Sequence, residues 1–241
     1  MPLDIKPIPV LSDNYAWLLT ASDGVRAVVD PGEAGPIIER IGDGRLDLIL
    51  LTHHHGDHTG GTEELRQRYG AKVYGGAEKK EWMPRLDHDV EDGDVFAIGN
   101  EEVRVLLTPG HAVGHVSYVV PAVPALFCGD VLFSAGCGRL LEGTAEELFN
   151  SLHRYDDLPD STLVCAGHEY TRSNLLFALH VDPDNADVKA RLEQVERLRK
   201  EGRPTLPVSL GVERRTNPFL RAPDVETFAR LRREKDSFRG G

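Results

Sequence analysis

The sequence predicts a layered α/β fold (of α+β type) with a helical C-terminal region. Up to residue 168, short apolar runs typical of strands are interspersed with segments typical of helices, a pattern that indicates sheets and helices packed in layers. After His168 the composition changes, and the apolar residues recur at helical spacing. We therefore expect two parts, residues 1–168 and residues 169–241.

In the first part, turn and cap residues separate the expected elements. Asp23-Gly24 divides two strands, Gly70 ends a helix, and Glu146 and Glu147 lie in the first turn of another helix, where they favour its dipole. We expect strands at residues 15–20, 26–30, 46–51, 71–74, 103–107, 116–120, 125–128 and 163–166, and helices at 35–41, 62–69 and 144–155.

Two helices are expected in the second part. Residues 186–201 place Val188, Leu192, Val195 and Leu198 at helical spacing, and Gly202 follows them. Residues 224–238 place apolar side chains three residues apart. We expect this region to pack on the α/β body.

Composition limits the possible partners and compartment. Hydrophobic residues at 40% and charged residues at 28% are typical of a soluble enzyme. A net charge of −11 argues against nucleic acid, and we expect neither a secretion signal nor a membrane segment. The three cysteines have no disulfide or metal spacing, which favours a reducing compartment. We expect a cytoplasmic monomer.

The C-terminal residues carry a local positive charge. Residues 212–241 contain eight Arg and Lys against five Asp and Glu. Such a patch on an acidic protein suits a small anionic ligand, and a solvated helix face explains the charge alone equally well.

Residues 52–58 place four metal-ligand side chains directly after an apolar strand. Along extended backbone His53 and His55 project to one side and His54 to the other, and Gly56 permits a change of direction. Asp57 and His58 then return towards the same point. Imidazole with carboxylate suits Zn, Mn or Fe.

Three more polar residues follow apolar strands in the same way, namely His111, Asp130 and His168. Together with the ligands of the first stretch they make seven, which exceeds what one ion with open positions needs. The set divides naturally between two divalent ions. Asp130 is the best bridge because a carboxylate offers two oxygens and a neutral imidazole one lone pair.

The spacing His53-x-His55-x-Asp57-His58, with a later His, Asp and His, resembles the metallo-β-lactamase superfamily, which implies an αββα sandwich with metals at one edge. Over nearly its whole length the chain resembles the glyoxalase II, or hydroxyacylglutathione hydrolase, family. The motifs that carry this resemblance are Gly110-His111-x-x-Gly114-His115, Gly136-Cys137-Gly138-Arg139, Gly167-His168-Glu169-Tyr170, Asn217-Pro218-Phe219 and Arg232-Arg233-Glu234-Lys235-Asp236.

The resemblance implies a role for each matched position. The first metal would be held by His53, His55, His111 and Asp130, and the second by Asp57, His58, His168 and the same Asp130. Glutathione would be bound by Arg139, Tyr170, Arg232, Lys235 and backbone groups near Cys137. Asp30 would orient a ligand or loop. Leu141 stands where the family often has a tyrosine, so one hydroxyl contact to glutathione is expected to be missing.

Three further residues are interpreted separately. His54 is expected to support the site or pack beside it, because it points away from its neighbours. His115 is expected to hydrogen-bond within the site. A nucleophilic role for Cys137 is disfavoured, since the nearby histidines are committed to metal.

The implied reaction is hydrolysis of S-D-lactoylglutathione to glutathione and D-lactate. Two ions about 3.5–4 Å apart would lower the pKa of a shared water to ~7. Asp57 beside the resulting hydroxide would manage a proton. A thiol leaves readily as thiolate, so no strong general acid is needed.

Three alternatives remain open from the sequence. A related persulfide dioxygenase would use a single iron with two His and one Asp. A nuclease or lactonase on the same fold would lack the segment with Arg232 and Lys235. A zinc-stabilised interaction domain would have a closed site with four ligands.

Overall fold

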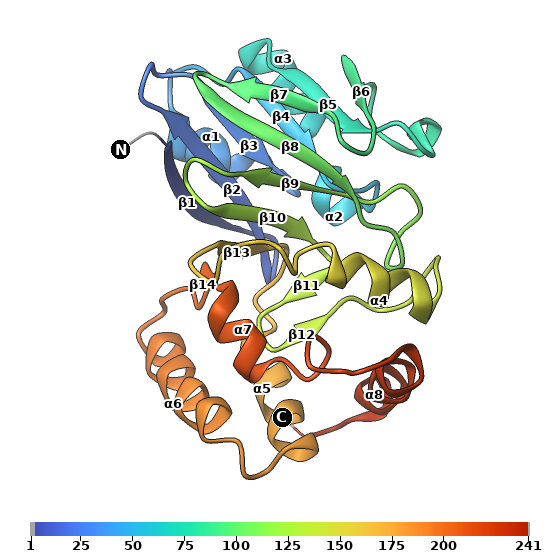
Figure 1. The fold of residues 1–241 in the computed structure, drawn as a ribbon. Coiled ribbons are helices and arrows are strands. Elements are labelled where there is room, and N and C mark those ends of the chain that lie inside the picture. Colours follow the sequence, from blue (N-terminus) through green and yellow to red (C-terminus); the bar gives the residue numbers. More distant parts are fainter. Residues whose placement is uncertain (1–2, 241) are drawn as a thin grey trace.

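The computed structural model describes residues 3–240, and its two sheets stack with helices outside them (Figure 1). The C-terminal helices, orange to red in the figure, lie together at one end of the sheets. The prediction of an αββα sandwich with a helical C-terminal region is confirmed.

The first sheet has the strand order β1-β2-β3-β4-β5-β6. Strand β2 pairs antiparallel with β1 and with β3. From β3 through β4 and β5 to β6, each pair of neighbouring strands is parallel. The strands are β1 Leu3–Val10, β2 Asn14–Ala21, β3 Arg26–Val29, β4 Leu48–Leu51, β5 Lys72–Gly76 and β6 His88–Val90. All four residues of β4 are apolar and buried, as expected for a strand covered on both faces.

The second sheet has the order β14-β13-β10-β9-β8-β7. Strands β10 and β13 are parallel, and the other pairs are antiparallel. The strands are β7 Val95–Ile98, β8 Glu101–Leu107, β9 Val116–Val120, β10 Ala125–Gly129, β13 Leu163–Ala166 and β14 Val208–Ser209. Because β14 comes from the C-terminal part, that part is joined to the body by backbone hydrogen bonds.

Helices pack against both sheets. The helices α1 Gly35–Ile41 and α3 Thr62–Tyr69 bury Ile37, Ile41 and Leu65 against the first sheet. The helix α4 Ala145–His153 begins with a capping box between Thr144 and Glu147, a favourable start for a helix. Leu148 and Leu152 of α4 belong to the main core.

The remaining elements are short or C-terminal. The short elements are the helix α2 Gly56–Thr59, the 3-10 helix η1 Lys80–Trp82, and the hairpin β11 Leu132–Phe133 with β12 Gly136–Cys137. The C-terminal helices are α5 Thr171–Val181, α6 Ala186–Lys200, α7 Leu210–Thr216 and α8 Val225–Ser237.

Buried polar side chains of the C-terminal part hold the hairpin. Asn217 donates from Nδ2 to the Phe133 and Gly136 carbonyls at 3.1 and 2.9 Å. Glu213 accepts from Ser134 Oγ at 2.7 Å and from the Ala135 N–H at 2.6 Å. Hydrogen bonds to residues about 80 positions later in the chain therefore hold the hairpin in place.

The predicted elements are confirmed with small changes at their ends. The helices α1 and α3 and the strands β9 and β13 have the predicted bounds, while β4 begins at Leu48 instead of residue 46. The sequence did not predict α5, α7 or the edge strands β6 and β7. Within residues 3–240, no helix is both long and apolar enough to cross a bilayer. The three cysteines are buried free thiols.

Candidate metal centre

Loops from both sheets meet at one edge of the sandwich. The segment after β4 carries His53 to His58, and the ends of β8, β10 and β13 lead to His111, Asp130 and His168. Strand ends of stacked sheets lie close in space even where the chain positions are far apart. The structure thus brings together all seven predicted ligands.

One group of imidazoles consists of His53, His55 and His111. Their candidate ligand atoms lie within 4.8 Å of one another. His111 Nε2 lies 3.2 Å from His55 Nδ1 and 3.4 Å from Asp130 Oδ2. The spacing suits an ion between the three rings, with Asp130 beside it.

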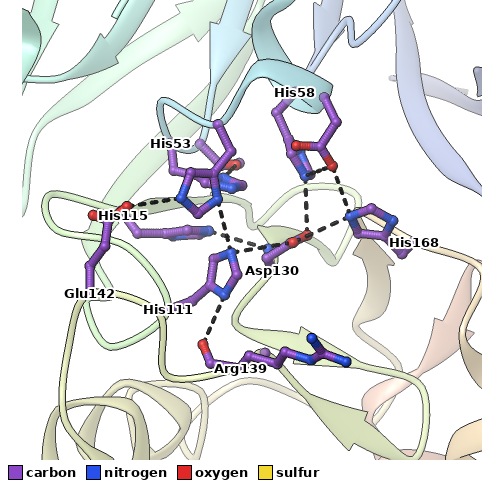
Figure 2. Close-up of polar contacts among 12 residues, drawn as sticks. His53, His58, His111, His115, Asp130, Arg139, Glu142 and His168 are labelled. Atoms are coloured by element: carbon purple, nitrogen blue, oxygen red, sulfur yellow. Dashed lines mark hydrogen bonds and ion pairs between the residues drawn. The ribbon is translucent and has the colours of Figure 1, made fainter. Parts of the chain in front are cut away.

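A second group consists of Asp57, His58 and His168, again with ligand atoms within 4.8 Å of one another. His168 Nε2 lies 3.3 Å from both Asp57 Oδ2 and Asp130 Oδ2, and His58 Nε2 lies 3.3 Å from Asp130 Oδ1. Figure 2 shows Asp130 between His111 on one side and His58 and His168 on the other. The carboxylate therefore stands between the two groups.

Three buried atoms of these groups lack a hydrogen bond of good geometry. His53 Nε2 has no hydrogen-bond partner among the described residues, and His58 Nε2 and Asp130 Oδ1 lie 3.3 Å apart without forming one. A buried polar atom without a partner costs about 1–3 kcal/mol. Coordination to a metal would satisfy all three, so these clusters are candidate sites for divalent metal ions.

The other nitrogen of each of the five imidazoles has a partner. An imidazole bound to metal usually has its second nitrogen hydrogen-bonded, which fixes the tautomer and the ring plane. The pairs are His53 Nδ1 with Thr52 Oγ1 (3.0 Å), His55 Nε2 with Glu142 Oε1 (2.9 Å), His58 Nδ1 with Asp30 Oδ2 (3.1 Å), His111 Nδ1 with the Arg139 carbonyl (2.9 Å) and His168 Nδ1 with Asp13 Oδ1 (2.8 Å). Figure 2 shows the contacts of Glu142 and of the Arg139 carbonyl.

Asp30 supports the site from an uncommon backbone conformation. Its φ is 50°, a region that Asp tolerates better than most residues. The carboxylate accepts from the Thr52 N–H at 2.8 Å and from Thr52 Oγ1 at 2.7 Å, and also meets His58. Asp30 thus hydrogen-bonds to the first residue after β4 and to a candidate ligand, and its orienting role stays a prediction.

Two glycines beside the ligands leave no space for a side chain. At Gly129, φ is 46°, and a Cβ would lie 2.4 Å from Thr52 Oγ1. At Gly167 a Cβ would lie 2.4 Å from Asp130 Oδ1 and 2.6 Å from a His58 ring carbon. Both glycines allow Asp130 and His168 to approach the other ligands.

His54 and His115 lie beside the two groups. His54 Nε2 pairs with Glu142 Oε1 at 3.0 Å, and its ring packs on the half-exposed Trp82 at 4.9 Å between centroids. His115 stacks on His53 at 4.9 Å and accepts from the Asp130 N–H at 3.3 Å. Both imidazoles therefore contact the groups from outside, and their supporting roles stay predictions.

Burial and neighbouring charges set the protonation of the imidazoles. Burial lowers the pKa of His53 and His111. Burial also opposes charge on His168, but hydrogen bonds to Asp130 and Asp57 raise the pKa of His168 to about 10. The Asp130 carboxylate likewise raises the pKa of the buried His58. His53 and His111 are therefore ready to offer lone pairs, whereas a metal at the second group must displace protons.

A cavity of about 510 Å³ opens from these groups towards the C-terminal helices. Its walls include, besides Asp57, Asp130 and three of the imidazoles, the predicted glutathione residues Cys137, Arg139, Tyr170, Arg232 and Lys235. Leu141 lies at the same cavity with 58% of its surface exposed. The Tyr170 ring stacks on the His168 ring at 4.6 Å.

Arg232 is more enclosed than we expected. Phe228 and Leu231 anchor α8 as predicted, but Arg232 is only 4% exposed. Its Nη1 donates to the Cys137 carbonyl at 2.8 Å, and its Nη2 pairs with Asp236 at 2.9 Å. Lys235 Nζ donates to the Ser173 carbonyl at 3.0 Å. Arg232 therefore supports the wall of the cavity, and Lys235 is the less buried of the two cations.

The sequence did not single out Asp13, Asn14 or Glu142, which contact the candidate ligands directly. Asp13 directly precedes β2 and Asn14 is its first residue, and such a pair is typical of an ordinary turn at the start of a strand. Glu142 lies 87 residues from His55. A carboxylate or amide near a ligand in space leaves no local sequence pattern.

Two family profiles match consecutive parts of the chain. The profile of the metallo-beta-lactamase superfamily matches residues 11–168, and that of the hydroxyacylglutathione hydrolase C-terminus matches residues 169–238. The first match covers more than half of the chain and includes both imidazole groups and Asp130. Fold and site together define a protein of the metallo-β-lactamase superfamily.

Individual relatives narrow the assignment. A hydroxyacylglutathione hydrolase of Acidiphilium cryptum (strain JF-5) is 50% identical over 236 residues, 97% of this chain and 96% of the relative. The crystal structure of ETHE1 from Myxococcus xanthus matches at a TM-score of 0.73 and 25% identity, over 98% of this chain and 93% of that one. TTHA1623 in a di-iron-bound form matches at a TM-score of 0.65 and 25% identity, over 89% and 99% of the two chains. The chain belongs to the hydroxyacylglutathione hydrolase family.

Proposed function

We propose that this protein hydrolyses S-D-lactoylglutathione and related S-2-hydroxyacylglutathiones to glutathione and the hydroxy acid, the second step in the detoxification of methylglyoxal. One observation carries the proposal. A single cavity joins the two candidate metal groups at one end to basic side chains from the C-terminal helices at the other. In a glutathione thioester, the thioester group matches the metal end of this cavity, and the two carboxylates of the thiol part match the basic side chains.

Two divalent ions, of Zn, Fe or Mn, fit the site. His53, His55 and His111 would hold the first ion, Asp57, His58 and His168 the second, and Asp130 both. Bound there, the ions would supply a water ionised near neutral pH and would polarise the thioester carbonyl. Support comes from the unpartnered nitrogens of His53 and His58 and from the name of the di-iron relative.

The residues of the chain divide the remaining tasks. Asp57, whose side chain is 42% exposed, lies at the cavity and would hold the proton of the attacking water. Lys235 and Arg139 would bind glutathione carboxylates through charge-assisted hydrogen bonds. Tyr170, stacked on His168, would contact the thiol part. When the C–S bond breaks, the sulfur leaves as thiolate, for which no strong acid is required.

The two parts of the chain would have separate tasks. Residues 1–168 would hold the metals, and residues 169–241 would recognise glutathione together with Arg139 of the first part. One chain supplies every group named above, so we propose that it acts as a monomer, in the cytoplasm.

The test is turnover of S-D-lactoylglutathione, measured as the release of free thiol and of D-lactate. The matched control is S-lactoyl-N-acetylcysteamine, which has the same acyl thioester without glutathione. We expect efficient hydrolysis of the glutathione thioester and poor hydrolysis of the control. Equal rates on the two would overturn the role of the C-terminal helices.

The rival functions give different results in the same preparation. A persulfide dioxygenase would consume oxygen with glutathione persulfide and leave the thioester intact. A lactonase or nuclease of the same fold would act on its own substrate at a higher rate than on the thioester. We expect neither result.

A further inference from the structure

The turn between β1 and β2 ends in Asp13, and β2 begins with Asn14; these two adjacent residues each contact a candidate ligand of the second metal. Their partners, His168 and Asp57, lie 155 and 43 residues away. No other pair of adjacent residues in residues 3–240 makes hydrogen bonds to two ligands of that group through both side chains. This arrangement points to a specific task for the turn.

Asp13 fixes the His168 ring. Its Oδ1 lies 2.8 Å from His168 Nδ1, so His168 donates through Nδ1 and directs Nε2 towards the other ligands of the second group. The Asp13 carbonyl accepts from the Glu169 N–H at 2.8 Å. The Asp13 side chain itself is 41% exposed, so it is not part of the core.

Asn14 fixes the Asp57 carboxylate. Its Nδ2 donates to Asp57 Oδ2 at 2.9 Å and to the Asp57 carbonyl at 3.2 Å. Asp57 Oδ2 is also the atom that lies 3.3 Å from His168 Nε2. Asn14 is 5% exposed and forms a backbone bridge with His168. The amide thus directs one chosen oxygen of Asp57 towards the other ligands.

Glu142 contacts a candidate ligand of the first group in the same way as Asp13 contacts His168 in the second. Its Oε1 lies 2.9 Å from His55 Nε2, and its Oε2 accepts from the Val113 N–H at 2.9 Å. The two groups therefore have separate outer supports, which come from different loops.

We propose that Asp13 and Asn14 are positioning residues that set the affinity of the second metal ion and leave that of the first unchanged. The inference rests on the proposed dinuclear centre. Partners of this kind change metal affinity by about tenfold to a hundredfold when they are removed. Asp13→Ala and Asn14→Ala should weaken the second ion by that factor, and Glu142→Ala should weaken the first.

The affinities of the two ions are measured separately in two background variants. We expect the His168→Ala protein to retain only the first ion, and the His111→Ala protein to retain the second ion better than the first. Zinc is withdrawn from each zinc-loaded protein by a chromophoric chelator, which gives its dissociation constant. In the His168→Ala background, adding Asp13→Ala or Asn14→Ala should change that constant by less than about twofold, whereas Glu142→Ala should raise it about tenfold or more. In the His111→Ala background the order should reverse.

Conservative variants separate positioning from a general loss of structure. Asp13→Asn keeps an acceptor oxygen and should restore part of the affinity, and Asn14→Gln keeps the donor. Asn14→Asp should be worse than Asn14→Ala, because it places a second carboxylate against Asp57. Melting temperatures of the metal-free proteins should be unchanged for Asp13→Ala, since its side chain is half-exposed.

Wild-type constants for both ions in Asp13→Ala and Asn14→Ala would overturn the proposal, as would equal weakening of both ions. Wild-type protein that binds only one ion would overturn the dinuclear centre and this inference together. Two ions without thioester hydrolysis would instead refute the proposed function and leave the positioning result intact.

Discussion

Asp130 Oδ2 lies 3.3 Å from His168 Nε2, at the junction of the two imidazole groups. The same carboxylate meets His111 at 3.4 Å and His58 at 3.3 Å. Asp130 is therefore the side chain that contacts both groups and links them. Burial opposes its charge, yet the His58 and His168 imidazoles hold the pKa of Asp130 well below its usual range.

Replacing Asp130 should therefore abolish the dinuclear centre. We expect Asp130→Ala to lose nearly all hydrolysis and to bind fewer than two ions, with the fold retained by circular dichroism. Asp130→Asn is the matched control of similar volume, and it should lose most of the metal as well, because the charge is gone. Two tightly bound ions with normal turnover in Asp130→Ala would refute the bridging role.

Lys235 should make substrate binding depend on pH. Burial, together with the nearby Arg232 and Arg139 charges, lowers the pKa of Lys235 to about 8. The ammonium is therefore present below that pH and is lost as the pH rises through it. We expect KM for the glutathione thioester to rise above about pH 8.

Two variants at the same position test this origin. Lys235→Arg stays charged, so its KM should not rise in that pH range. Lys235→Met should have a KM that is high, about tenfold to a hundredfold above wild type, and independent of pH. The prediction fails if Lys235→Met retains the rise above pH 8.

Arg232 should affect stability as well as binding. The buried guanidinium donates to the Cys137 carbonyl and lies over the Phe219 ring at 5.2 Å from its centroid. Removing it leaves that carbonyl unpaired, so Arg232→Ala should lower the free energy of unfolding by about 1.5–3 kcal/mol and raise KM about tenfold to a hundredfold.

The neighbouring Arg233 is exposed and serves as the control. Arg233→Ala should change neither quantity in urea denaturation or steady-state kinetics. Lys235→Ala should raise KM with little change in stability. An Arg232→Ala protein with wild-type stability and KM would show that the Arg232 charge on α8 contributes neither to stability nor to substrate binding.

Leu141 is the position at which the resemblance led us to expect a missing hydroxyl contact to glutathione. Its side chain is exposed at the cavity. Leu141→Tyr should lower KM for the glutathione thioester by roughly twofold to tenfold, the value of one neutral hydrogen bond. Leu141→Phe adds the ring without the hydroxyl and should give no such gain. If both variants behave alike, a hydroxyl contact does not explain the effect.

The sequence predicted the framework of the site because ligands follow buried strands. The apolar run that contains β4 indicated a strand leading to His53, and the run before His168 indicated β13. Helix α5 was missed because Leu175, Phe177 and Ala178 are all buried, so its apolar residues do not form one narrow stripe. Asp13 and Glu142 were missed because they act across 155 and 87 residues. The enclosure of Arg232 depends on how α8 packs, which helical spacing does not determine.

The most direct test of the central claim is a zinc titration of metal-free protein with S-D-lactoylglutathione turnover recorded at each step. Two ions sharing Asp130 predict that full activity is reached only near the second equivalent of zinc. The Asp130→Ala protein should stay inactive throughout. Full activity after a single equivalent, or none after two, would contradict a dinuclear glutathione thioester hydrolase.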